Sequence, residues 1–374
     1  MSAGARLVAG AILACLALPA AGCGSEPSGD DVPFVAEAAA RAGDCPGPRT
    51  QFGPSKPPPA CWRPYSDASP FNRTVPAKPR IAADSDAVIG RLTGWGPPQR
   101  LAAGHSKTDG DYFHPVYWSR ASDPLYTVHC VRYGSCPIEG HRVRIPAAAR
   151  PAGGDDAHMA VIDTRSGWEY DFWQVRPKSR NGGRLTVSHG GRTRIAGKGL
   201  GSNATAAWFG LAAGQIRGAE MAAGRIDHAI FTTVRCTSGT SVYPAHPGTS
   251  AAPCSTFDEA TENAPPLGAR IWLDLPAKSI ERLDVPNWKK TLLLAMHRYG
   301  MIVGDTMSGH SSWGLVGESG AGYTSFGKAD PWAQFAARVT SARSAEGYSL
   351  NFGDAVDWRR HLHIVDPCVS HGGC

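Results

Sequence analysis

The sequence carries little charge, and the charge that it has is not gathered into runs. Only 19% of the 374 residues are Asp, Glu, Lys or Arg, and Lys and Arg exceed Asp and Glu by 38 − 32 = 6. No basic run could track a phosphate backbone, so the composition argues against nucleic acid as a partner. A hydrophobic fraction of 42% is ordinary for a globular protein, and the length suits one large domain or two small ones.

Several common motifs are also missing. No Cys-x-x-Cys pair occurs, which argues against a zinc–thiolate site. The absence of Gly-x-Ser-x-Gly and His-Glu-x-x-His removes support from serine hydrolases and zinc peptidases. The stretch GKGLG at 197–201 lacks the spacing of a phosphate-binding P-loop. We therefore predict neither a cofactor nor a metal ion.

Long apolar runs are scarce, and the clearest one lies at the N-terminus. Arg6 precedes LVAGAILACLALPAAGC (7–23), which has the length of a signal peptide and is short and alanine-rich for a membrane span. The run ends in AAGC, which resembles a bacterial lipobox with Ala20 where leucine is usual. We expect residues 1–22 to be a signal peptide and Cys23 to carry a lipid that holds the protein outside the membrane. Plain secretion is the alternative.

The other cysteines agree with export. Cys15 lies in the removable segment, and the eight cysteines after Cys23 form four close pairs along the chain. Disulfide loops are typical of exported proteins. Because eight cysteines permit about 105 pairings, nearest-neighbour pairing is a hypothesis. The expected pairs are Cys45/Cys61, Cys130/Cys136, Cys236/Cys254 and Cys368/Cys374.

Glycine (44) and proline (30) are abundant, which predicts many turns and short elements. Residues 23–60 are expected to form a flexible lipid-anchored tether ending in the stiff piece GPSKPPPA, and residues 61–374 a single domain. Strand-like runs follow one another with single helices between them. This pattern favours a mainly β fold, an antiparallel sandwich of jelly-roll or lectin-like type with a few inserted helices. Strands are expected at 158–163, 168–173, 184–189, 228–234, 270–275, 301–306 and 361–366, and helices at 84–92, 202–211, 285–300 and 330–342.

The most informative stretch is HMAVIDTRSGWEYDFW, in which two strand-like runs flank a four-residue loop at 164–167. If Asp163 pairs with Trp168, directly opposed residues share a face of the sheet. One face is then apolar and the other carries an imidazole, two carboxylates and an indole. A slip of one residue would dissolve this grouping. The apolar face carries Met159, Val161, Trp168, Tyr170 and Phe172, and the polar face carries His158, Ala160, Ile162, Glu169, Asp171 and Trp173.

A second histidine is brought in by RIDHAIFTTV, residues 225–234. If Phe231 points to the core, alternation places His228 on a polar face. A cluster of His158, Asp171 and His228 could carry out acid–base chemistry, because imidazole titrates near neutrality and a carboxylate orients it. For each single histidine, a structural role in a polar layer is the alternative.

These residues suggest an enzyme that acts on an extracellular or cell-wall polysaccharide, either a lyase or a glycoside hydrolase. His158 and His228 would be the acid–base pair, with Asp171 orienting them or acting as the acid. Tyr170 is a second proton donor, although the register places it on the apolar face. Trp173 would stack on a sugar, Glu169 would contact the substrate, and Arg270 would bind an acidic substituent, unless it forms an ordinary salt bridge with Asp274 or a neighbour.

A glycosidase needs two carboxylates at a defined separation, for which Asp171 with Glu169 or Asp305 are the candidates. The competing function is a non-catalytic glycan- or envelope-binding lipoprotein. A disulfide-stabilised scaffold without a ligand is a third possibility, and the sequence leaves the oligomeric state open.

Three stretches carry a family resemblance: GRIDHAIFTTV, PPLGARIWLDL and LLLAMHRYGMIVGDT. From about Phe71 onward the chain resembles a family of secreted bacterial proteins, of actinobacterial type, whose function is unassigned. The resemblance implies export and a shared architecture, and it implies no reaction.

Overall fold

A computed structural model describes residues 45–96, 100–104, 111–249, 252–307, 312–339, 342–344 and 347–374. The expected signal peptide, Cys15, the lipidation candidate Cys23 and tether residues 24–44 lie outside these ranges. Within them, no helix combines the length and the apolar character needed to span a membrane.

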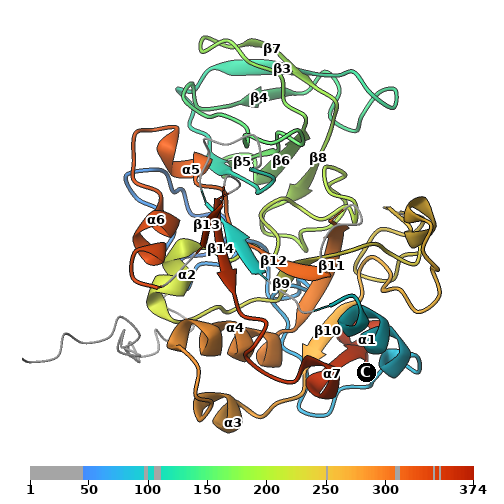
Figure 1. Ribbon diagram of the computed structural model, residues 1–374. Helices are drawn as coiled ribbons and strands as arrows, with labels where there is room; N and C mark the ends of the chain where they lie inside the picture. The colour runs from blue at the N-terminus through green and yellow to red at the C-terminus, as the bar shows by residue number, and fades with distance from the viewer. Residues whose placement is uncertain are drawn as a thin grey trace, which may run out of the picture.

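Short strands dominate the described chain, and the helices between them are also short (Figure 1). The strands are β1 (Arg100–Ala103), β2 (Val116–Trp118), β3 (Leu125–Cys130), β4 (Arg142–Arg144), β5 (Met159–Asp163), β6 (Trp168–Trp173), β7 (Gly183–Val187), β8 (His189–Arg194), β9 (Ile230–Val234), β10 (Arg270–Leu273), β11 (Met301–Thr306), β12 (Trp313–Val316), β13 (Ala342–Ser344), β14 (Gly347–Asn351) and β15 (Leu362–Val365). The helices are α1 (Ser85–Gly94), α2 (Gly218–Ala223), α3 (Ala277–Glu281), α4 (Asn287–Arg298), α5 (Ala321–Thr324), α6 (Pro331–Ala336), α7 (Trp358–His361) and α8 (Pro367–His371), with a 3₁₀ turn at Cys254–Phe257.

The strands form three mixed sheets. The eight-stranded sheet has the order β13-β14-β1-β12-β9-β11-β10-β15, and the two smaller sheets are β2-β5-β6-β8 and β4-β3-β7. Each sheet contains a parallel pair, for example β9 with β11, β2 with β5 and β3 with β7. The mainly β class is confirmed, but the expected purely antiparallel arrangement is wrong. Parallel neighbours need a long crossover, and residues 235–300 supply one between β9 and β11.

The two smaller sheets form a lobe with its own core, above the large sheet in Figure 1. We call residues 116–200, which contain β2 to β8, the small-sheet lobe. The large sheet has a separate core that includes Ile230, Ile271 and Ile302. Helix α4 packs on β10 and buries Leu292 and Met296 at i and i+4, as the apolar stripe of an amphipathic helix predicts.

The hairpin register is confirmed. Strands β5 and β6 pair antiparallel, with Asp163 opposite Trp168 and Ala160 opposite Asp171. The helix expected at 202–211 is wrong, because this segment is a series of turns. Trp208 has a left-handed φ of 62°, which no α-helix accommodates. The hydroxyl of Thr205 accepts the backbone N–H of Phe209 at 2.8 Å and so closes a turn.

All four expected disulfides form. The first joins Cys45 to Cys61 and bounds a segment expected to belong to the flexible tether. Instead, this segment packs on the domain: Phe52 is buried, and the Trp62 indole donates to the Gly47 carbonyl at 3.2 Å. We call residues 45–62 the N-terminal strap. The folded region therefore extends at least to Cys45, sixteen residues before the expected boundary at Cys61.

Candidate functional site

Glu169 and Asp171 lie together on β6, but both are fully buried. The Tyr65 hydroxyl donates to Glu169 at 2.7 Å, and the Ser202 hydroxyl donates to Asp171 at 2.6 Å. Burial raises the pKa of both carboxyls, and the charge of Glu169 raises the pKa of Asp171 further. The pair has no exposed surface through which to contact a polysaccharide, so its visible role is to hold Tyr65 and Ser202 against β6.

His158 immediately precedes β5 and is also buried. Its ring lies 4.8 Å from that of His114, centroid to centroid, in an edge-to-face arrangement. Burial lowers the pKa of His158 to about 4 and that of His114 to about 3. Both imidazoles are therefore neutral at pH 7, which makes them weak bases.

His228 lies elsewhere, just before β9 of the large sheet. Its Nε2 lies 3.1 Å from a carboxylate oxygen of Glu220, and its Nδ1 lies 3.0 Å from the Ala229 carbonyl oxygen. In the described part of the chain, no hydrogen bond or ion pair joins His228 to His158 or Asp171. The predicted three-residue cluster is therefore not brought together, because alternation along a strand does not reveal which sheet the strand joins.

Of the other predicted side chains, Tyr170 and Arg270 are buried and Trp173 is partly exposed. Tyr170 faces the core of the small-sheet lobe, as the register predicted. Arg270 is buried, and its guanidinium donates to the carbonyls of Tyr299 (2.8 Å) and Arg73 (2.6 Å). Burial lowers its pKa to about 9. The structure thus ties Arg270 to the backbone and gives it neither an exposed surface nor the alternative salt bridge with Asp274. Trp173, by contrast, is partly exposed at the end of β6.

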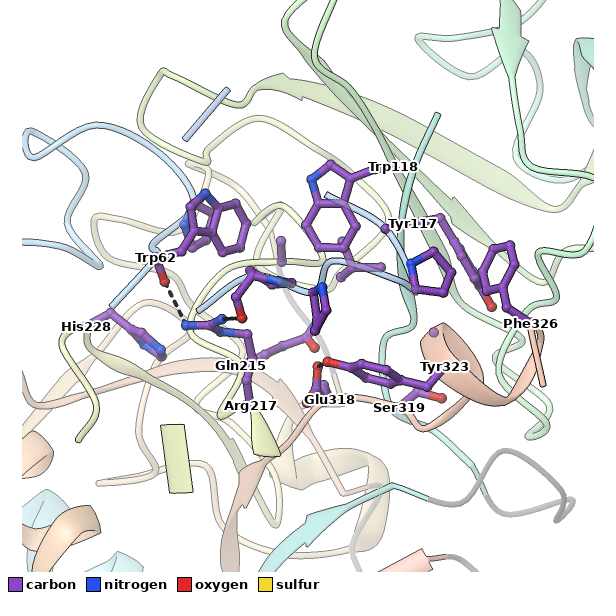
Figure 2. A pocket seen from close by; sticks show the side chains of 18 residues that line it. Trp62, Tyr117, Trp118, Gln215, Arg217, His228, Glu318, Ser319, Tyr323 and Phe326 are labelled. Atoms are coloured by element: carbon purple, nitrogen blue, oxygen red, sulfur yellow. Dashed lines mark hydrogen bonds between the residues drawn. The ribbon is translucent and has the colours of Figure 1, made fainter. Parts of the chain in front are cut away.

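A groove does exist, and of the predicted residues only His228 lines it (Figure 2). It runs between the N-terminal strap and α5 and spans about 720 Å³, open mouth included. We call it the aromatic groove, because indole, phenol and phenyl rings form much of its wall. The aromatic side chains are Trp62, Tyr117, Trp118, Tyr323 and Phe326, the prolines are Pro54, Pro57, Pro58 and Pro64, and the polar side chains are Gln215, Arg217, His228, Glu318 and Ser319.

Glu318 is the only carboxylate among the described residues that line the groove. It accepts the backbone N–H of Gly218 at 2.8 Å and the hydroxyl of Tyr323 at 3.0 Å. Burial raises its pKa to about 7, so Glu318 exchanges its proton near neutral pH. Figure 2 shows Trp62 and Trp118 at one side of the groove and Tyr323 with Glu318 at the other.

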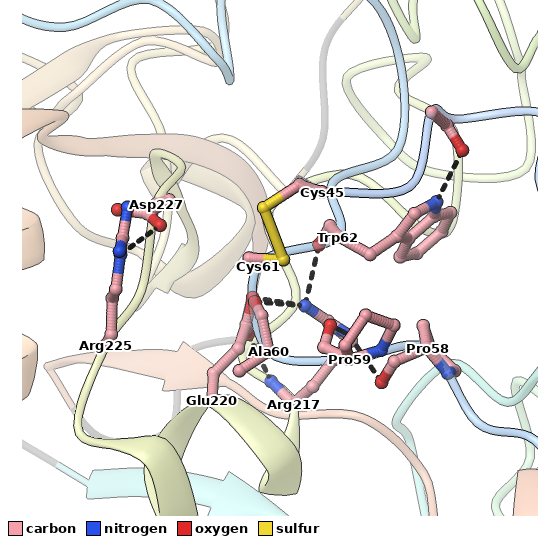
Figure 3. The surroundings of a disulfide bond; sticks show 11 residues. Cys45, Pro58, Pro59, Ala60, Cys61, Trp62, Arg217, Glu220, Arg225 and Asp227 are labelled. Atoms are coloured by element: carbon pink, nitrogen blue, oxygen red, sulfur yellow. Dashed lines mark hydrogen bonds and ion pairs between the residues drawn. A yellow bond between two sulfur atoms is a disulfide. The ribbon is translucent and has the colours of Figure 1, made fainter. Parts of the chain in front are cut away.

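Arg217 fixes the strap as one wall of the groove (Figure 3). Its guanidinium donates to the carbonyls of Pro59 (3.0 Å), Ala60 (2.9 Å) and Trp62 (2.7 Å), and to Glu220 at 2.7 Å. Because Glu220 also lies 3.1 Å from Nε2 of His228, the strap is joined to the start of β9 through a buried chain of polar side chains. All these contacts engage Arg217 within the protein.

Glu318, Tyr323 and Arg217 were not predicted from the sequence as site residues. A signal for Glu318 was present, because an acidic residue follows the apolar strand WGLV between Gly317 and Gly320. The sequence contains no such signal for Arg217, because its partners in the strap lie about 155 residues away.

Two groups in the described chain have ligand atoms close enough to hold a metal ion: Cys130, Cys136 and Glu139, and Asp366, Cys368 and Cys374. In both, the cysteines form a disulfide with each other. Their sulfurs are therefore not thiolates, the form in which cysteine binds metals.

No family model, curated protein or solved structure shows significant similarity to the chain. The resemblance to secreted bacterial proteins thus stays a prediction from sequence.

Proposed function

We propose that this is an exported protein that binds an extracellular or cell-wall glycan in the aromatic groove. The observation that carries the proposal is a concave site whose lining includes five aromatic side chains and, among the residues that the structure describes, one acid, Glu318. Binding pockets are typically mostly apolar, with a few polar groups that fix the orientation of the ligand. The C–H-bearing face of a pyranose ring can lie against the electron-rich face of an aromatic ring, while Glu318 and Gln215 can bond hydroxyl groups.

The cysteines support an extracytoplasmic location, since four disulfides are typical of an oxidising compartment. Attachment to the membrane through a lipid on Cys23 is part of the proposal, as is the lectin-like sandwich expected from the sequence. Residues 24–44 would then connect the anchor to the strap.

Catalysis is the second candidate, and the pKa of Glu318 favours it. A carboxyl with a pKa of about 7 is suited to general-acid work near neutrality. A glycosidase of the common type needs a second carboxylate beside the scissile bond, and the described residues that line the groove supply only Glu318. Binding without turnover therefore fits the geometry better.

The test uses residues 24–374 with a panel of neutral and acidic oligosaccharides. Titration calorimetry measures affinity, and assays for new reducing ends and for unsaturated uronates detect turnover. Truncation of an aromatic anchor typically costs more than 1 kcal/mol, so Trp118→Ala should weaken binding about tenfold. Trp288→Ala removes a partly exposed indole on α4 and is the matched control.

Absence of binding to every glycan, or equal losses in the two tryptophan variants, would overturn the groove assignment. Turnover that disappears in Glu318→Gln would establish the catalytic candidate, whereas turnover that persists in this variant would remove Glu318 as the acid.

A further inference from the structure

A second surface with features of a ligand site lies on the small-sheet lobe, and none of the side chains that form this surface lines the groove. Tyr133 is 72% exposed, the highest value among the exposed large hydrophobic residues of the described chain. It has a left-handed φ of 58° and sits in the short loop closed by the Cys130–Cys136 disulfide. Its ring is nearly parallel to that of Trp173, at 11° between planes and 6.3 Å between centroids.

Arg132 completes this surface, which we call the Arg132 platform (Arg132, Tyr133 and Trp173). Its guanidinium carbon lies 5.3 Å from the centroid of the Tyr133 ring and 5.4 Å from that of Trp173. The guanidinium donates to the neutral amide of Gln174 at 3.4 Å, and no carboxylate forms an ion pair with it in the described part of the chain. The nearby Asp156 accepts the indole N–H of Trp173 at 2.8 Å.

The small-sheet lobe also carries a net positive charge. Residues 116–200 contain 13 Lys and Arg against 7 Asp and Glu, a net charge of 13 − 7 = +6. The rest of the chain contains 25 of each, so the entire net charge of the protein lies in this lobe. Two of the seven acids, Glu169 and Asp171, are fully buried. Basic charge concentrated on one lobe attracts a polyanion.

We propose that the Arg132 platform binds an acidic polysaccharide through a carboxylate-bearing sugar. The sugar ring would lie on Tyr133 and Trp173, and its carboxylate would form a two-pronged contact with the guanidinium of Arg132. A single-stranded nucleic acid could use the same stacking and charge. The four disulfides place the protein in an oxidising compartment, which favours the glycan. The proposal goes beyond the groove and does not depend on it.

Polygalacturonate and its methyl-esterified form are the probes, because they share a sugar ring and differ in charge. Calorimetry with residues 24–374 should show binding to the acid polymer that weakens with added salt, and at least tenfold weaker binding to the ester. Arg132→Gln and Tyr133→Asn should each lower the affinity for polygalacturonate about tenfold. Asparagine is chosen at 133 because it tolerates a left-handed φ.

Arg282→Gln is the matched control, since it removes the same charge from an exposed position outside the small-sheet lobe. It should leave the affinity unchanged. A loss of affinity for polygalacturonate in the groove variant Trp118→Ala, with none in Arg132→Gln, would place the polymer in the groove and overturn this proposal without touching the groove assignment. Circular dichroism confirms that each variant is folded. Equal affinity for acid and ester, unchanged binding in Arg132→Gln, or tighter binding to a single-stranded oligonucleotide would overturn the proposal.

Discussion

Arg217 is the residue whose replacement most directly tests how the strap is held on the domain. Its side chain is 9% exposed and joins Glu220 to the carbonyls of Pro59, Ala60 and Trp62. Arg217→Met keeps most of the stem and removes the guanidinium. The change takes the guanidinium from Glu220, which keeps its contact with His228, and removes one donor from each of the three strap carbonyls.

The size of the effect follows from the buried ion pair. Removing one partner of such a pair typically costs about 3–5 kcal/mol. The chain from Cys45 onward has 374 − 44 = 330 residues, and an unfolding entropy of about 2.1 cal/mol/K per residue gives about 0.7 kcal/mol/K. The melting temperature should therefore fall by about 4–7 °C.

Differential scanning calorimetry measures this loss, and hydrogen exchange locates it. The strap amides of Lys56 and Trp62, bonded to the carbonyls of Gly53 and Pro59, should exchange faster in the variant, while those of β9 should not. Arg80→Met is the control, because Arg80, whose side chain is 69% exposed, pairs with Asp366 at 3.1 Å near the surface. Such a pair contributes less than about 1 kcal/mol. A loss in Arg217→Met no larger than in the control would refute the reasoning.

Two further changes probe buried groups. Burial raises the pKa of Asp171 in the folded protein. Above the ordinary carboxyl pKa of about 4, the folded protein therefore binds a proton that the unfolded chain has lost. The free energy of unfolding then falls as the pH rises toward the pKa of Asp171 in the folded protein. Asp171→Asn removes this dependence. It should be at least as stable as the wild type in urea at pH 8 and lose its advantage toward pH 4, whereas a less stable variant at pH 8 would contradict the sign. Replacing both cysteines of the Cys236–Cys254 disulfide by alanine opens a loop of 18 residues and should cost about 3 kcal/mol, against about 2 kcal/mol for the six-residue Cys130–Cys136 loop. Denaturant midpoints in the reverse order would contradict the loop-length argument.

Local features could be predicted from sequence because neighbours along the chain determine them. The loop at 164–167 and strict alternation were enough to give the register of β5 and β6. Short cysteine intervals gave all four disulfides, and the apolar spacing in residues 287–298 gave α4.

What could not be predicted depends on distant contacts. The polar face of β6 looked solvent-exposed, but Tyr65, 104 residues before Glu169, covers that carboxyl. His228 could be assigned to a polar face but not to a sheet, so its partner Glu220 was missed. The strap looked like a tether because GPSKPPPA has few apolar residues. Its position depends on backbone carbonyls bonded to Arg217, which no side-chain pattern reveals.

The central claim is that a saccharide occupies the aromatic groove. A crystal structure of the protein with an oligosaccharide selected from the binding panel tests it most directly. We expect a sugar ring between Trp118 and Tyr323, with a hydroxyl group bonded to Glu318. A sugar bound beside His114 and His158 instead, or an empty groove in crystals grown at saturating ligand, would contradict the account.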